Sequence, residues 1–152
     1  MDKGAHFSED RIYRYALWRI WDNNKPLIMF IGLNPSTADE DNNDRTINRV
    51  KNFASDWGYG GFYMVNLFAY ITPYRNELKN CTDPVGENDG WLERLSKKCE
   101  KIVFAWGSSK IAKERAKEVV QKFDGYALKK NKDGSPRHPL YIKSDTELQL
   151  FK

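Results

Sequence analysis

The sequence predicts an α/β fold of three layers, in which helices cover both faces of a mostly parallel central sheet. The continuous apolar run at 27–31 is typical of a strand buried on both faces, and 62–68 and 102–106 are expected to be two further buried strands. Segments with apolar residues at helical spacing lie between these runs, which indicates alternating strands and helices. The chain has 152 residues without a repeat, linker or composition break, so we expect residues 1–152 to form a single domain.

The N-terminal part is expected to supply one strand after an irregular start. Residues 1–10 contain no apolar run, which predicts a frayed terminus without a secretion signal. Residues 12–20 alternate aromatic and polar side chains, and this pattern predicts a strand. Turn-forming residues at 22–24 connect it to the apolar run 27–31, so these two strands are expected to form a hairpin.

Helices and strands are then expected to alternate to near the C-terminus. Asp44 is a suitable N-cap for a helix with apolar residues on one face, and Ser108 or Ser109 is expected to begin the last helix. In order, we expect a helix at 44–57, a strand at 62–68, a helix at 89–99, a strand at 102–106, a helix from 108 or 109 to about 123, a short strand at 126–128 and an extended segment at 139–142.

Polar residues follow the carboxyl ends of the predicted strands, which is where open α/β sheets bind ligands. Asn34, Asn66, Ser108 and His138 each follow a different strand, with glycine or proline beside most of them. Their convergence predicts a site at this edge of the sheet. The candidate binding and catalytic residues are Gly32, Asn34, Pro35, Ser36, Asn66, Phe68, Gly107, Ser108, Arg137 and His138.

The loop after the run 27–31 contains a glycine, a proline and an asparagine that suit a ligand site. Gly32 lets the backbone come near a ligand, and Pro35 stiffens the turn. Asn34 both donates and accepts hydrogen bonds, so it could hold a water or read the edge of a base. The alternative is that Asn34 and Ser36 only satisfy the loop backbone.

The later loops offer an anion site and a titratable group. Gly107 and Ser108 would open a helix whose free N–H groups favour a phosphate, although an ordinary N-cap is the alternative. His138 lies in a loop beside a proline and could act as acid, base or oxyanion donor, or be merely structural. Phe53, Trp57 and Phe68 could stack on a base, but helical spacing assigns the first two to the core.

Several chemistries are disfavoured by the pattern of residues. The acidic loop 39–44 does not follow the EF-hand spacing, so we expect a solvated loop and no metal. Two cysteines, Cys81 and Cys99, cannot form a disulfide framework or hold an iron–sulfur cluster. No P-loop and no G-x-S-x-G motif occurs, which leaves Ser36 and His138 a poor match for a hydrolase triad. No cofactor is expected.

Charge and hydropathy indicate the compartment and the partner. No apolar run approaches the ~20 residues that span a bilayer, so no membrane segment is expected, and few cysteines favour a reducing cytoplasmic location. Residues 93–132 carry twelve basic and five acidic residues, a net charge of +7. This excess suits a polyanion such as nucleic acid or a nucleotide, with a solvated lysine-rich helix face as the alternative.

Two resemblances follow from these motifs. The runs Ile31-Gly32-Leu33-Asn34-Pro35-Ser36-Thr37-Ala38-Asp39, Trp57-Gly58-Tyr59-Gly60-Gly61, Val65-Asn66-Leu67-Phe68-Ala69 and Arg137-His138-Pro139-Leu140-Tyr141 resemble an uncharacterised bacterial and phage family, known as a domain of unknown function. More distantly, the Gly32-to-Ser36 run is similar to the first motif of the uracil-DNA glycosylase superfamily, and His138-Pro139 to the start of its second. That resemblance implies an α/β/α sandwich in which Asn34 positions the attacking water.

The residues and the resemblance together support two functions. The first is hydrolysis of an N-glycosidic bond in a nucleic acid or nucleotide, with Asn34 placing the water and His138 stabilising the departing base. Asn66 would then read the base edge, and Ser108 would hold a phosphate. The second is a non-catalytic nucleic-acid or nucleotide-binding module that uses the same pocket. The base, the choice between DNA, RNA and free nucleotide, and the oligomeric state stay open.

Overall fold

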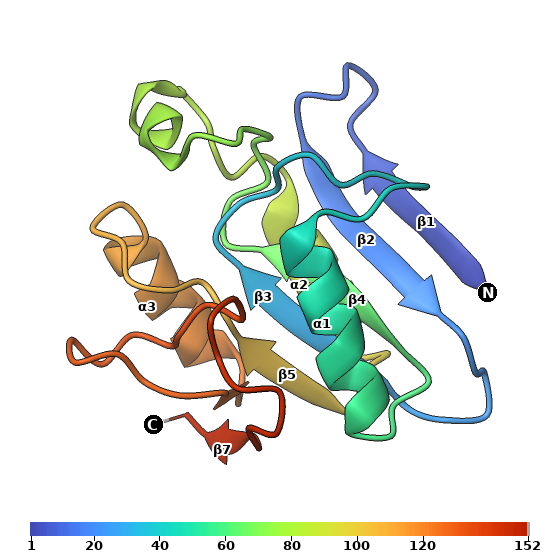
Figure 1. Ribbon diagram of the computed structural model, residues 1–152. Coiled ribbons are helices and arrows are strands. Elements are labelled where there is room, and N and C mark those ends of the chain that lie inside the picture. Colours follow the sequence, from blue (N-terminus) through green and yellow to red (C-terminus); the bar gives the residue numbers. More distant parts are fainter. Residues whose placement is uncertain (152) are drawn as a thin grey trace.

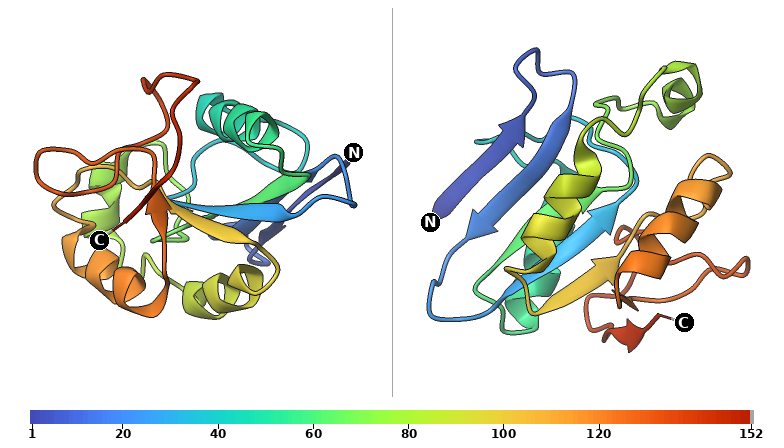
Figure 2. Two further views of the ribbon diagram at one scale, coloured as in Figure 1. Left: turned by 90° about the horizontal axis from the view of Figure 1, so that it is seen from below. Right: turned by 180° about the vertical axis from the view of Figure 1, so that it is seen from behind.

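The computed structural model describes residues 1–151 and contains one mixed sheet of seven strands with helices on both of its faces (Figures 1 and 2). The strands lie in the order β1-β2-β4-β3-β5-β6-β7. Their bounds are β1 Asp2–Phe7, β2 Arg14–Ile20, β3 Leu27–Gly32, β4 Gly61–Asn66, β5 Lys101–Phe104, β6 Tyr126–Ala127 and β7 Gln149–Leu150. The helices are α1 Arg45–Asp56, α2 Asn88–Ser96 and α3 Lys113–Lys122, with a 3-10 helix η1 at Arg75–Asn80.

The prediction of a mostly parallel sheet is wrong. Strands β4, β3, β5 and β6 run parallel to one another, but β1, β2 and β7 add antiparallel pairs at the two edges. The expected frayed terminus is also wrong, because Asp2–Phe7 pairs with β2 along its length. Gly4 makes this pairing possible, since a Cβ there would meet the Trp18 ring.

The expected hairpin between the strand at 12–20 and the run 27–31 does not form. Strand β2 pairs with β1 and β4, and β3 lies between β4 and β5. The physical reason is burial, because β3 carries apolar side chains on both faces and needs neighbours on both sides. Ile28 and Phe30 pack into one core and Met29 and Ile31 into the other, all four fully buried.

Helices cover the two faces of the sheet as the alternation of elements predicts. Helix α1 packs on one face through its buried apolar stripe, whereas α2 and α3 lie on the other face (Figure 2). Asp44 caps α1 as expected, since its side chain accepts the N–H of Ile47 at 2.8 Å. Phe53 and Trp57 belong to the core beside Phe30, as their spacing predicts.

The C-terminal third departs most from the predicted elements. Helix α3 begins at Lys113, with Ala112 as its N-cap, and not at Ser108 or Ser109. The Ser108 hydroxyl donates to Asp133 at 2.5 Å, so it does not cap a helix. The expected extended segment at 139–142 is a turn in which Tyr141 has φ 68. Strand β7 has no counterpart among the predicted elements.

The order of the strands creates a crevice at one edge of the sheet. From β3 the chain crosses to β4 on one side, and the next parallel strand, β5, lies on the other side of β3. Loops that leave neighbouring strands in opposite directions open a crevice at their carboxyl ends. This switch point places the ends of β3, β4 and β5 around one site. No helix among residues 1–151 is long and apolar enough to cross a membrane.

Candidate functional site

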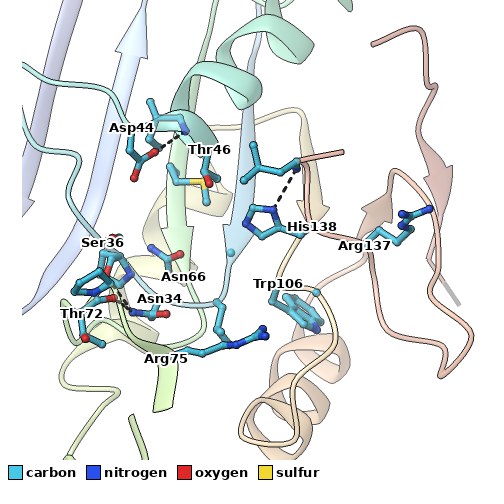
Figure 3. A pocket seen from close by; sticks show the side chains of 18 of the residues that line it. Asn34, Ser36, Asp44, Thr46, Asn66, Thr72, Arg75, Trp106, Arg137 and His138 are labelled. Atoms are coloured by element: carbon cyan, nitrogen blue, oxygen red, sulfur yellow. Dashed lines mark hydrogen bonds between the residues drawn. The ribbon is translucent and has the colours of Figure 1, made fainter. Parts of the chain in front are cut away.

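A cavity of about 490 Å³ lies at the carboxyl ends of β3, β4 and β5, and we call it the central cavity (Figure 3). Its volume is within the range of about 300–1,000 Å³ that is usual for ligand sites. Nine of the ten predicted site residues line it: Gly32, Asn34, Pro35, Ser36, Asn66, Gly107, Ser108, Arg137 and His138. The structure therefore brings together residues that are about a hundred positions apart in the chain.

Asn34 is fixed by its amide nitrogen and leaves its amide oxygen free. The nitrogen donates to the backbone carbonyl oxygens of Thr72, at 2.8 Å, and Pro35, at 3.0 Å. The oxygen makes no hydrogen bond within the protein and points into the central cavity, away from Thr72 (Figure 3). Asn34 thus satisfies the loop backbone and also presents an acceptor to a ligand or a water.

The backbone also orients the ring of His138, which leaves a donor free where Asn34 leaves an acceptor free. Its Nδ1 accepts the N–H of Leu140 at 3.2 Å, so the neutral ring carries its proton on Nε2. Burial lowers the pKa of His138 below 6.5, with Asp44 opposing and Arg75 adding to this effect. At pH 7 the ring is therefore neutral, and it extends into the central cavity as a hydrogen-bond donor (Figure 3).

Asn66 lies at the end of β4, deep in the central cavity. Its side chain is almost fully buried, and its amide nitrogen has no hydrogen-bond partner. An unsatisfied buried donor costs about 1–3 kcal/mol, which a ligand could recover. Gly32 makes room for this amide, because a Cβ at Gly32 would lie 2.7 Å from Oδ1 of Asn66.

Three further predicted residues, Gly107, Ser108 and Arg137, line the central cavity but differ in what they contribute to it. Gly107 has φ +78 and donates its N–H to the carbonyl of Pro136 at 2.9 Å, which anchors the loop that carries His138. Ser108 is tied to Asp133, and no helix begins there, so the predicted anion site at a helix N-terminus is wrong. Arg137 contributes to the wall, but its guanidinium points away from Asn34 and His138 (Figure 3).

Phe68 does not belong to the central cavity. It is 5% exposed and packs in the apolar core under α2 and α3. The residue two positions earlier, Asn66, is the one whose side chain reaches the cavity. Strand β4 ends at Asn66, so the alternation of faces along the strand no longer places Phe68 on the ligand side.

Two basic residues of the central cavity, Arg14 and Arg75, are not among the residues predicted from the sequence. Arg14 comes from β2, and Arg75 reaches across the floor of the cavity from η1 (Figure 3). The signal for Arg14 is visible in the sequence, because a charged residue interrupts a strand of apolar and aromatic residues. Arg75 carries no such signal, since its position depends on the path of a long loop. Thr72, Asp44 and Thr46 also line the cavity.

The acidic loop 39–44 is explained by structural contacts. The Asp39 carboxylate accepts the N–H groups of Asp41 and Asn42, and these hydrogen bonds lower its pKa. Glu40 pairs with Arg11 at 3.0 Å. Within residues 1–151 no group of three or more His, Cys, Asp or Glu side chains is arranged to hold a metal ion.

The sequence model of a family described as a protein of unknown function (DUF1643) matches residues 14–140. The chain belongs to this family. The DUF1643 match covers every element from β2 to the His138 loop, and so the whole central cavity except Tyr141. No curated protein and no solved structure matches the sequence.

Proposed function

We propose that the protein hydrolyses an N-glycosidic bond, releasing the base of a nucleotide unit bound in the central cavity. The observation that carries this proposal is the paired geometry of Asn34 and His138. Each side chain is held by the backbone through one polar atom, and each presents the other polar atom to the same cavity. One of these atoms is an acceptor and the other is a donor, as the reaction requires.

Asn34 supplies the acceptor that orients the nucleophile. A water that donates to Oδ1 of Asn34 would have a lone pair free to attack C1′ of the sugar. An amide cannot take a proton, so Asn34 orients the water without activating it strongly. The C1′–N bond must therefore be largely broken before the new C1′–O bond forms, and the proton of the water passes to solvent.

His138 supplies the donor that stabilises the departing base. The electron pair of the C1′–N bond moves onto the base, whose carbonyl oxygen becomes negative. A neutral imidazole that donates Nε2–H to that oxygen stabilises the charge without a prior protonation step. By analogy with one oxyanion-hole donor, this interaction is worth roughly 3–4 kcal/mol.

Asn66 is suited to recognise the base. Its amide carries a donor and an acceptor, as the edge of a pyrimidine or purine does, and the donor has no partner within the protein. The resemblance to the uracil-DNA glycosylase superfamily agrees with these roles for Asn34 and His138. Helices on both faces of four adjacent parallel strands are in keeping with the α/β/α sandwich which that resemblance implies.

The test is the release of free base, measured by mass spectrometry. Single- and double-stranded oligonucleotides with uracil, mismatched thymine, hypoxanthine or hydroxymethylated bases serve as substrates, together with nucleoside monophosphates. We expect release by the wild type and a loss of at least a hundredfold in Asn34→Ala and His138→Ala. Undiminished release in both variants would contradict the assigned roles, and no release by folded wild type would contradict the activity.

Matched variants separate a catalytic effect from a general one. Asn52→Ala removes an exposed amide from the middle of α1, and His6→Ala removes the other histidine, which packs against Trp91 on the far side of the sheet. Both are expected to release base at the wild-type rate. Circular dichroism of all four variants shows whether the fold persists.

A second function, nucleic-acid binding without catalysis, is favoured by a groove next to the central cavity. This groove has a volume of about 670 Å³ and shares Trp106, Gly107 and Ser108 with the central cavity. Lys110, Lys113 and Lys117 line it. If the groove holds a polyanion, the affinity of the protein for a single-stranded oligonucleotide falls steeply as the ionic strength rises. The slope of this salt dependence is expected to be smaller in Lys113→Ala. Binding that is independent of salt would contradict this function.

A further inference from the structure

Arg14 is a buried cation without a direct ion pair, and the charge of the Asp44 carboxylate only partly offsets the cost of its burial. It is 3% exposed, and it lines the central cavity from β2. Its Nη1 donates to the carbonyl of Ala38 at 3.1 Å, but Nε has no partner and Nη2 makes no hydrogen bond. No carboxylate among the described residues forms an ion pair with it. Buried charges are normally paired, because an unpaired one is costly to remove from water.

The other buried arginines show what the fold does with a structural cation. Arg19 is 2% exposed and donates to Asn43 and to the backbone carbonyls of Gly4, Trp18 and Asp39. Arg115 is 6% exposed and is neutralised by Asp89, at 2.6 Å, and by Glu118, at 3.2 Å. Arg14 alone among these three lines a cavity and keeps unused donors.

A second cation faces the same space. Arg75 extends into the central cavity from η1 and forms no hydrogen bond or ion pair within the protein (Figure 3). Asp44 is the only carboxylate among the residues lining the cavity, and one of its oxygens accepts the N–H of Ile47. The cavity therefore holds more positive than negative charge, and the unused groups of these two arginines are hydrogen-bond donors.

We propose that Arg14 and Arg75 form a phosphate subsite in the central cavity, which holds the phosphate of the nucleotide whose base lies between Asn34, Asn66 and His138. A guanidinium presents parallel N–H groups that match phosphate oxygens, and such charge-assisted hydrogen bonds are the strong ones. The inference rests on the proposed function for the base and sugar of the ligand. The phosphate requirement follows from the two arginines themselves.

Binding measured by calorimetry tests the subsite without reference to catalysis. The ligands are inorganic phosphate, a panel of nucleoside 5′-monophosphates, the matching nucleosides and a single-stranded octanucleotide of mixed sequence. We expect phosphate-bearing ligands to bind at least tenfold more tightly than nucleosides. Comparison of the affinities for the monophosphates and the octanucleotide shows whether the subsite prefers a free nucleotide or a polynucleotide backbone. If no phosphate-bearing ligand binds, or if nucleosides bind equally well, the proposal is wrong.

Variants of the two arginines assign the effect to the subsite. Arg75→Ala changes an exposed residue that makes no hydrogen bond or ion pair and should fold normally, whereas Arg14→Lys keeps the buried charge but loses the planar donors. Each is expected to weaken phosphate binding about tenfold or more. Arg94→Ala removes the same charge from α2, where Arg94 lies over Trp91, and should bind as the wild type does.

The outcomes for the subsite and for the proposed reaction are distinguishable. Phosphate binding that depends on Arg14 and Arg75 in a protein that releases no base would support the subsite and reject the hydrolase. Base release that is unchanged in Arg75→Ala and Arg14→Lys, with nucleosides as good as nucleotides, would keep the hydrolase and reject the subsite. Equal phosphate affinity in the wild type and Arg75→Ala would also contradict a role for Arg75.

Discussion

Gly32 and Asn66 are paired across adjacent parallel strands, and a single added carbon at Gly32 would lie 2.7 Å from the amide oxygen of Asn66. The amide is thereby held at the bottom of the central cavity, where its nitrogen has no partner. The ends of β3 and β4 therefore act as one unit in shaping this wall of the central cavity. The size of the side chain at 32 decides where the amide of Asn66 can lie.

Gly32→Ala is expected to displace Asn66 and to weaken ligand binding by about tenfold or more, since a base edge would lose its partner. The same Cβ would also lie 2.7 Å from the Met64 methyl group, so a loss of about 1–3 kcal/mol in the free energy of unfolding is expected. Calorimetric binding and urea denaturation measure the two effects. Gly90→Ala in α2 meets no close neighbour and is the control. Unchanged binding in Gly32→Ala would show that Asn66 is not used.

The pKa of His138 predicts how stability depends on pH. Burial lowers this pKa in the folded protein below its unfolded value of 6.5. Well above pH 6.5 both states hold a neutral ring, and the group contributes nothing to the pH dependence. As the pH falls below 6.5, the unfolded state takes up a proton before the folded state does, so the free energy of unfolding decreases by at most about 1.4 kcal/mol per pH unit.

His138→Asn removes this titration and should flatten the profile. Urea denaturation of both proteins between pH 5 and pH 8 measures the difference, which is expected to appear only below pH 6.5. Base release should fall at lower pH, as the pH drops through the lowered pKa of folded His138, because a protonated Nδ1 can no longer accept the Leu140 N–H. Parallel profiles for the two proteins would show that folding does not lower the pKa of His138.

Local patterns in the sequence are sufficient to predict some of the helices and strands and most of the residues that line the central cavity. The apolar run in β3 and the Asp44 cap of α1 are both read correctly, because strand burial and helix capping depend on nearby residues. The convergence of Asn34, Asn66 and His138 follows from the rule that parallel strands end at one edge. The positions where prediction fails are those that depend on distant partners.

Three failures illustrate this dependence on distant partners. Strand β1 exists because Gly4 fits under the Trp18 ring, a contact between residues that no local pattern connects. Helix α3 begins late because Asp133 takes the Ser108 hydroxyl that would have capped it. Arg14 lines the central cavity because β2 pairs with β4, whereas the expected hairpin with 27–31 would have placed it elsewhere.

Asn34→Asp tests whether the orientation of the amide matters. The carboxylate would face the carbonyl oxygens of Thr72 and Pro35 where the amide nitrogen now donates. The unpaired buried acceptors are expected to cost about 1–3 kcal/mol in the free energy of unfolding and to release the loop. Base release should fall at least a hundredfold, although an acceptor is still present. Wild-type rates in Asn34→Asp would mean that an acceptor alone is sufficient.

Arg14 and Arg115 are both buried, but their replacement by methionine should change the free energy of unfolding by different amounts. Arg115→Met removes two ion pairs and the hydrogen bond to the Leu67 carbonyl, so we expect a loss of about 2–4 kcal/mol in the free energy of unfolding. Arg14→Met removes a charge without a direct ion pair and one hydrogen bond to Ala38, and an apolar side chain of similar length can fill the space. Its free energy of unfolding is therefore expected to stay within about 1 kcal/mol of the wild type.

Urea denaturation without ligand and with saturating inorganic phosphate separates the two roles. Phosphate should stabilise the wild type and Arg115→Met by mass action, but not Arg14→Met. This result would show that Arg14 contributes to phosphate binding and contributes little to the stability of the free protein. If Arg14→Met instead destabilises the free protein as strongly as Arg115→Met, then Arg14 is structural, and its unused donors do not indicate a phosphate.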